Sequence, residues 1–129
     1  MLFRSSDYLQ PTASALYAIG TGNFTLEAWI YPTQSASTEA PVIKMYKLNG
    51  SALELRQNLN KIVCIIANSS GTETQISGTL ALNINAWNHI AFVRSGTTVY
   101  TFMNGVLDQT STGQNQSVSS TDKIGRAHV

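Results

Sequence analysis

The chain has 129 residues, of which 43% are hydrophobic and only 12% charged, and its formal net charge is +1 at pH 7. This length suits one domain that buries a core without metals or disulfides, and the scattered lysines and arginines argue against a nucleic-acid partner. No apolar run approaches the roughly 20 residues of a membrane span, so we expect no membrane insertion.

The low charge leaves most of the surface polarity to Ser, Thr, Asn and Gln, since a typical domain has about 25% charged residues. This composition favours secreted or surface-displayed β-proteins. The N-terminus lacks the apolar core of a signal peptide, so any export signal is expected on an upstream part of a larger protein.

Runs of β-branched and aromatic residues, separated by Gly, Asn, Ser and Pro, recur from end to end and predict an all-β chain. The expected strands, in chain order, are Leu2–Arg4, Phe24–Tyr31, Val42–Leu48, Ala52–Gln57, Lys61–Ala67, Thr74–Ser77, His89–Ser95 and Tyr100–Met103, with a further strand opening at Ile124. We expect Thr12–Ile19 to connect strands as a loop, and Gln109–Thr121 to form a long exposed loop.

Three short segments predict tight hairpin turns. Asn49-Gly50 and Asn104-Gly105 combine residues that adopt positive φ angles readily, and Ser95–Thr97 links two β-prone runs. Because the strands are short and no helices lie between them, the sequence predicts a two-sheet antiparallel sandwich or jelly roll.

The only cysteine, Cys64, lies in the apolar run "KIVCIIA". We expect it to be buried as a small hydrophobic residue rather than to act in catalysis or metal binding. A single cysteine also excludes a disulfide within the chain.

The strand at Phe24–Tyr31 has two different faces. Successive strand residues point to opposite sides, so one face carries Phe24, Leu26, Ala28 and Ile30, and the other carries Thr25, Glu27, Trp29 and Tyr31. The first face suits the core between the sheets, and the second suits an outer face that is solvated or holds a ligand. Pro32 is expected to end the strand because it lacks a ladder donor.

Three segments together resemble the laminin G-like, concanavalin A-like jelly-roll domains. They are "GTGNFTLEAWIYP" (Gly20–Pro32), "WNHIAFVRSGTTVYTFMNGV" (Trp87–Val106) and the opening "LFRSSDYL", and their order and spacing agree along nearly the whole chain. The resemblance implies two curved antiparallel sheets packed face to face. It also implies a closing strand after the "IGR" motif, which this chain lacks.

The last residues have a second interpretation. Ile124–Val129 equals the translation, up to the stop codon, of one frame of a common short-read sequencing adapter, and the two adapter bases before this frame would complete a lysine codon, which matches Lys123. We therefore expect 123–129 to be adapter read-through and 1–122 to be an incomplete laminin G-like domain from a metagenomic fragment. The alternative is that "KIGR" is genuine family sequence and only the final three residues coincide.

Catalysis has little support in the sequence. The catalytic branch of the resembling superfamily comprises β-glucanases, and retaining glycosidases need two carboxyl groups about 5–5.5 Å apart. The seven acids are isolated from one another in sequence: Asp7, Glu27, Glu39, Glu54, Glu73, Asp108 and Asp122. A cross-strand pair of Glu27 and Glu54 stays open, and His89 is interpreted as a structural hydrogen-bonding residue.

Calcium is a possible cofactor that the resemblance suggests, since some relatives bind it at a rim of the sandwich. Asp7, in the turn "RSSDYL", and Asp108, just after "NGVL", are the candidate ligands. The alternative is that Asp7 hydrogen-bonds backbone in its turn and that Asp108 is a solvated loop residue.

Aromatic residues are candidate platforms for sugars, whose apolar C–H faces stack on rings while their hydroxyls bond polar side chains. The candidate platforms are Trp29, Tyr31, Trp87 and Tyr100, and the candidate ligand site is Trp29 and Tyr31 with Glu27 on the same strand face. Whether Trp29 instead closes an end of the core stays open. We expect Trp87, which precedes a strand, to close one end of the core.

Two classes of function remain. The first is a non-catalytic recognition module that binds glycans or a cell-surface polysaccharide, within a larger extracellular, cell-surface or phage tail-associated protein. The second is a structural or adhesion spacer that binds nothing small and contacts neighbouring domains. A β-glucanase-type glycoside hydrolase is the remote alternative, and fold alone does not decide among them.

Overall fold

The computed structural model describes residues 18–47, 50–68 and 70–118. These ranges contain eight strands and no helix. The strands are β1 (Phe24–Ile30), β2 (Ala36–Lys47), β3 (Gly50–Leu59), β4 (Lys61–Ala67), β5 (Glu73–Ser77), β6 (Asn88–Ser95), β7 (Thr98–Met103) and β8 (Val106–Ser111).

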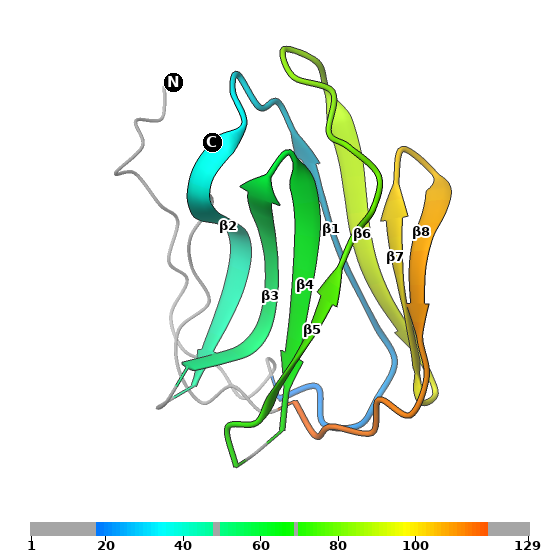
Figure 1. Ribbon diagram of the computed structural model, residues 1–129. Helices are drawn as coiled ribbons and strands as arrows, with labels where there is room; N and C mark the ends of the chain where they lie inside the picture. Colours follow the sequence, from blue (N-terminus) through cyan, green and yellow to red (C-terminus); the bar gives the residue numbers. More distant parts are fainter. Residues whose placement is uncertain (1–17, 48–49, 69, 119–129) are drawn as a thin grey trace.

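The strands form two four-stranded antiparallel sheets that face each other, as Figure 1 shows. The first sheet has the order β1-β6-β7-β8, and the second has the order β2-β3-β4-β5. Between β1 and β6 the chain builds the whole second sheet before it returns to the first. The predicted all-β, two-sheet antiparallel sandwich is confirmed.

The largest differences from the predicted strands lie in β2 and β8, whereas the bounds of the other strands agree with the prediction to within two residues at each end. β2 begins at Ala36, well before the predicted Val42, and three register irregularities let this longer strand pair with β3 despite Pro41. β8 was not predicted, because "VLDQTS" alternates poorly. The predicted loop from Gln109 is therefore wrong at its start, since Gln109–Ser111 pair with β7.

Two of the predicted hairpin turns are confirmed by backbone conformation and register. Asn104 and Gly105 have φ angles of 52° and 78°, and the residues on either side of them pair across β7 and β8. Gly96 has a φ of 60° between the paired residues Ser95 and Thr98. Asn49, the strand at Leu2–Arg4 and the segment from Ile124 lie outside the described residues.

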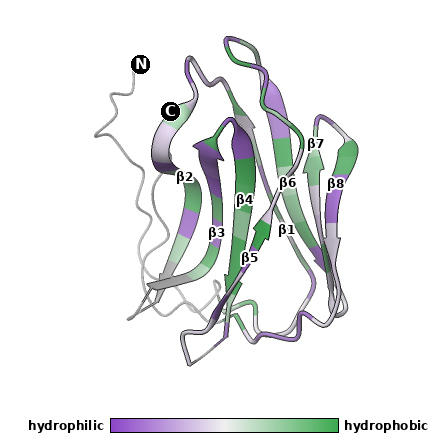
Figure 2. Cartoon of the chain, viewed as in Figure 1, coloured by the Kyte–Doolittle hydropathy of each residue, from purple (hydrophilic) through white to green (hydrophobic). Residues whose placement is uncertain are grey.

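The core lies between the sheets and draws on both. Its buried members are Val42, Met45, Ala52, Leu53, Leu55, Ile62, Cys64, Ile66, Ile76, Leu82, Ile90, Phe92, Val99, Met103 and Val118. β4 is the most hydrophobic strand (Figure 2). Six of its seven residues are buried. The predicted burial of Cys64 is confirmed, and desolvation, with a smaller contribution from the charge of Asp108, raises the pKa of its thiol.

A buried arginine joins the segment before β1 to the segment after β8. The Nε–H of Arg94 on β6 donates to the Gly22 carbonyl at 2.8 Å, Nη1 donates to the Gln116 carbonyl at 2.8 Å, and Nη2 donates to the Gly20 carbonyl at 2.7 Å. Its guanidinium also lies 5.0 Å from the centroid of the Phe24 ring. Burial lowers the pKa of Arg94, yet arginine keeps its charge in proteins.

Gly20 and Val118 are themselves bridged. The Gly20 N–H donates to the Val118 carbonyl at 2.7 Å, and the Val118 N–H donates to the Gly20 carbonyl at 2.8 Å. Two segments about a hundred residues apart in sequence are therefore held together beside the Arg94 guanidinium.

Replacing Arg94 by Met is expected to lower the free energy of unfolding by about 2–4 kcal/mol, because several charge-assisted hydrogen bonds to carbonyls are lost. Urea unfolding followed by circular dichroism measures this change. Lys61→Met is the matched control, since it removes one positive charge from an exposed position of β4. Equal unfolding free energies for the two variants would show that Arg94 does not hold the fold.

The turn between β3 and β4 carries local strain. Leu59 has a φ of 54°, in the left-handed region that non-glycine residues adopt at a cost, and its side chain is exposed. The turn is tight because Asn58 pairs with Lys61. The Leu59 carbonyl accepts a hydrogen bond from the Gln57 Nε2 amide at 2.8 Å, which helps to fix this conformation.

Leu59→Asn is expected to raise the free energy of unfolding by about 0.5–1.5 kcal/mol, because asparagine tolerates the left-handed region better than leucine. Thermal and urea unfolding measure the gain. Leu107→Asn, at an exposed leucine with no positive φ, is the control and is expected to give no gain. A Leu59 variant no more stable than wild type would contradict the strain argument.

Candidate functional site

The outer face of β1 presents the predicted ligand-site residues to solvent. The strand alternates between partly buried and exposed residues, with Phe24, Leu26, Ala28 and Ile30 packed against the core. Glu27 and Trp29 point outward, and their side chains are about two-thirds exposed, at 60% and 66%. The two faces predicted for this strand are therefore present.

Trp29 pairs across the strands with His89. The two residues are register partners in the β1–β6 ladder, and their rings lie 5.1 Å apart at an interplanar angle of 46°. The His89 Nε2 lies 3.3 Å from the Glu27 Oε2, so the imidazole bridges the indole and the carboxylate. The backbone of His89 is fixed by Asn104, which accepts from its N–H and donates to its carbonyl, each at 2.8 Å.

Tyr31 lies just beyond β1 and contacts Trp87 edge to face. Their ring centroids are 5.6 Å apart at 70°. The Trp87 side chain is 62% exposed, so the expectation that it closes one end of the core is wrong. The reason is that Trp87 precedes His89 by two residues and so continues the outward-facing side of β6.

The loop that carries Trp87 is held by two asparagines. Asn88 is fully buried, and its amide donates to the carbonyls of Asn83 and Ala86, both at 2.9 Å. Its Oδ1 accepts from the Asn83 N–H at 2.9 Å. The Asn85 N–H donates to the Pro32 carbonyl at 2.7 Å, which ties this loop to the end of β1. These hydrogen bonds to the loop backbone therefore hold Trp87 beside Tyr31.

We call this surface the aromatic face and define it by Glu27, Trp29, Tyr31, Trp87 and His89. Sequence reasoning found the three residues on the β1 side and missed the two on the β6 side. Trp87 and His89 are two residues apart in "WNH", a spacing that places both on one face of a strand. Their position beside Trp29 and Tyr31 depends on the cross-strand register, which only the structure supplies.

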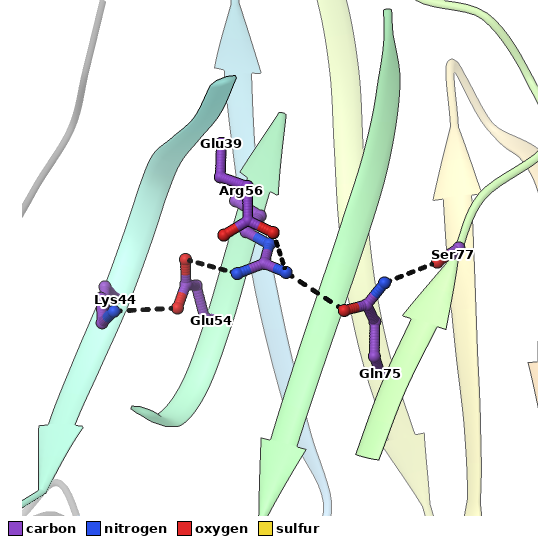
Figure 3. A network of polar contacts seen from close by, with 6 residues as sticks. All are labelled: Glu39, Lys44, Glu54, Arg56, Gln75 and Ser77. Carbon is purple, nitrogen blue, oxygen red and sulfur yellow. Dashed lines mark hydrogen bonds and ion pairs between the residues drawn. The ribbon is translucent and has the colours of Figure 1, made fainter. Parts of the chain in front are cut away.

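The second sheet carries a separate polar cluster of Glu39, Lys44, Glu54, Arg56, Gln75 and Ser77 (Figure 3). Glu54 is almost fully buried and pairs with Lys44 at 3.2 Å and with Arg56 at 3.9 Å. Arg56 also contacts Glu39 at 2.6 Å and donates to Gln75 at 3.1 Å. Two acids and two bases therefore balance one another in this cluster.

The possible carboxylate pair of Glu27 and Glu54 does not form. Glu27 is on β1 in the first sheet, whereas Glu54 is on β3 in the second and interacts with bases there. That route to a glycosidase site is excluded by the fold. His89, interpreted as a structural hydrogen-bonding residue, does fix a backbone contact but also contributes its ring to the aromatic face.

Asp108, one of the two calcium candidates, binds backbone amides. Its carboxylate accepts from the Thr79 N–H at 2.9 Å, the Thr79 hydroxyl at 2.8 Å and the Leu80 N–H at 3.2 Å. The described residues contain no group of three His, Cys, Asp or Glu side chains placed to hold a metal ion. Asp7 lies outside the described residues, and calcium binding stays a prediction.

The sequence as a whole matches a known family. A laminin G profile, described as the concanavalin A-like lectin/glucanases superfamily, matches residues 3–128. The chain belongs to this superfamily. A search of curated protein sequences with this chain found no match.

Solved structures share the fold of this laminin G-like chain at low sequence identity. The botulinum neurotoxin serotype D binding domain has a TM-score of 0.75 and 15% identity, over 95% of this chain and 32% of that one. Domains LG4-5 of the mouse laminin α1 chain have a TM-score of 0.73 and 11% identity, over 94% and 32%. The binding domain of botulinum neurotoxin DC, in complex with rat synaptotagmin II, has a TM-score of 0.68 and 18% identity, over 92% and 31%.

The laminin G-like chain thus spans about a third of the length of these structures. Their similarity establishes the fold. Among the residues that the structure describes, no helix is long and apolar enough to cross a membrane.

The Asp108 contacts join the two sheets, because Asp108 is on β8 and Thr79 follows β5. Gly78 makes this approach possible, since a Cβ at that position would collide with the Asp108 carboxylate and the Ile62 carbonyl. Desolvation raises the pKa of Asp108, but hydrogen bonds from Thr79, Leu80 and Gln109 outweigh it and lower the pKa below its ordinary value.

A lowered pKa in the folded state means that Asp108 stabilises the fold above the unfolded pKa of about 3.9, and that this contribution is lost as the pH falls through the folded pKa. We expect Asp108→Asn to lower the free energy of unfolding at neutral pH and the deficit to shrink below about pH 4. Urea unfolding of both proteins between neutral and acidic pH measures the difference. A deficit that does not change with pH would show that the charge of Asp108 is unimportant.

Proposed function

We propose that this laminin G-like chain is a non-catalytic recognition module that binds carbohydrate through Glu27, Trp29 and Tyr31. The observation that carries the proposal is the exposure of three large rings on one surface. Trp29, Tyr31 and Trp87 are 66%, 38% and 62% exposed and are held in place by cross-strand and loop contacts. Exposed aromatic residues gathered in one place mark interaction sites more often than scattered ones do.

The chemistry of the aromatic face suits a sugar. The apolar C–H face of a sugar ring stacks on an indole or phenol ring, and this removes apolar area from water. The Glu27 carboxylate accepts hydrogen bonds from sugar hydroxyls, and the His89 imidazole offers a further polar group beside Trp29. Because the rings are already positioned, little conformational entropy is lost on binding.

The proposed module is non-catalytic because of where its acidic residues lie. Glu27 has no second carboxylate on its sheet face, since β1, β6, β7 and β8 contain only one other acid, Asp108, which binds Thr79 and Leu80. In the second sheet, Glu39 and Glu54 both face the Arg56 guanidinium. A retaining glycosidase needs a pair of acids in which one is a nucleophile and the other a proton donor.

The proposed setting is a larger extracellular, cell-surface or phage tail-associated protein in which this chain is one module. Support comes from the low charge of the sequence and from the solved structures, in which a domain of this fold is about a third of the chain. These structures are a toxin binding domain and a pair of laminin domains.

A spacer function has one observation in its favour. Val106 and Leu107 are exposed on β8, an edge strand of the first sheet in the described structure, where a neighbouring domain could cover them. In this alternative the chain positions its neighbours and binds no small ligand.

The test is binding of the 129-residue chain to a panel of polysaccharides by calorimetry or affinity electrophoresis. Trp29→Ala and Tyr31→Ala are each expected to weaken binding at least tenfold, with unchanged circular dichroism, because each removes a stacking ring. Leu59→Ala, at an exposed apolar residue of the β3–β4 turn, is the control and is expected to bind as wild type does.

Failure of the folded chain to bind any polysaccharide of the panel would favour the spacer function. Binding that survives both aromatic substitutions would show that the sugar is recognised elsewhere on the molecule.

A further inference from the structure

The two sheets differ in charge. Among the four strands of the first sheet the only lysine or arginine is Arg94, whose guanidinium is buried and bonds the carbonyls of Gly20, Gly22 and Gln116. The described loops that flank these strands, 18–23, 31–35, 78–87 and 112–118, contain no charged residue. The second sheet, by contrast, carries Lys44, Lys47, Arg56 and Lys61.

Glu27 is therefore the one carboxylate that the described first sheet presents to a ligand. Its side chain is 60% exposed, and the His89 imidazole lies 3.3 Å from its carboxylate. The other acid of this sheet, Asp108, accepts hydrogen bonds from Thr79 and Leu80 and does not belong to the aromatic face. Among the described residues, Glu27 forms no ion pair with an arginine or lysine.

The aromatic rings around Glu27 favour positive charge as well. The faces of Trp and Tyr rings carry negative electrostatic potential and attract cations. Trp29 is two residues from Glu27 on the same strand face, a separation of about 6.7 Å along the strand, and Tyr31 continues the row. An amine substituent on a sugar ring stacked over Trp29 would therefore lie within reach of the Glu27 carboxylate.

From this arrangement we infer that the ligand of the aromatic face is a glycan with protonated primary amines, such as a de-N-acetylated amino-sugar polymer. The inference rests on the proposed carbohydrate-binding function and narrows it to one chemical class. A sulfated or uronic acid polymer is disfavoured, because its negative charges would meet Glu27, and the described residues place no lysine or arginine on this face. A neutral sugar would offer Glu27 only hydroxyl donors, whereas an ammonium group adds an opposite charge to the hydrogen bond.

The test compares two ligands of equal length, a glucosamine oligomer with free amines and its fully N-acetylated counterpart, by titration calorimetry with the 129-residue chain at low ionic strength. The free-amine oligomer is expected to bind about tenfold more tightly, and added salt is expected to reduce this preference. Glu27→Gln, which keeps the shape of the side chain and removes its charge, is expected to abolish most of the preference.

The control for total charge is Glu73→Gln, which removes one negative charge from β5 in the second sheet and is expected to keep the preference. Trp29→Ala is expected to weaken both oligomers. Equal binding of the two oligomers, or a preference that survives Glu27→Gln, would overturn the inference. Weaker binding of both oligomers to the Trp29→Ala variant would in that case still support carbohydrate binding. If neither oligomer binds, the inference is overturned, and the neutral polysaccharides of the panel then decide the proposed function by themselves.

Discussion

The antiparallel register between β1 and β6 is the constraint on which the rest of the structure depends. It runs through seven residue pairs, from Phe24 opposite Arg94 to Ile30 opposite Asn88. A slip of one residue would turn the core face of β1 toward solvent and bury its polar face. Arg94 opposes such a slip, because its guanidinium bonds the carbonyls of Gly20 and Gly22 just before β1 begins.

The same register builds the aromatic face. It places Trp29 opposite His89, and it brings the end of β1 beside the loop that Asn88 holds. The Tyr31–Trp87 contact follows from the Asn85 hydrogen bond to Pro32 at this end of the strand. Stability and the candidate binding surface thus share one ladder, with the buried arginine near one end of it and the exposed rings near the other.

The division of charge between the sheets gives the molecule two different outer faces. The second sheet pairs its acids with bases, and Glu54 is covered almost completely within that cluster. The first sheet has few charges, so a single exposed carboxylate among rings is a distinctive chemical feature there. Asp108 joins the sheets at their edge and is used for structure, which leaves the carboxylate of Glu27 as the polar centre of the aromatic face.

Local sequence determined the type of the elements and the sidedness of β1, because strand alternation and turn chemistry act over a few residues. β4, the Asn104-Gly105 turn, the outward placement of Glu27 and Trp29 and the burial of Cys64 were all predictable in this way. Only the tertiary structure decided which residues meet across strands. It exposed Trp87, added His89 to the site, separated Glu27 from Glu54 and made a strand of Val106–Ser111, since pairing with β7 compensates for weak alternation. Register and sheet order depend on contacts between segments distant in sequence, and no local pattern in one chain specifies them.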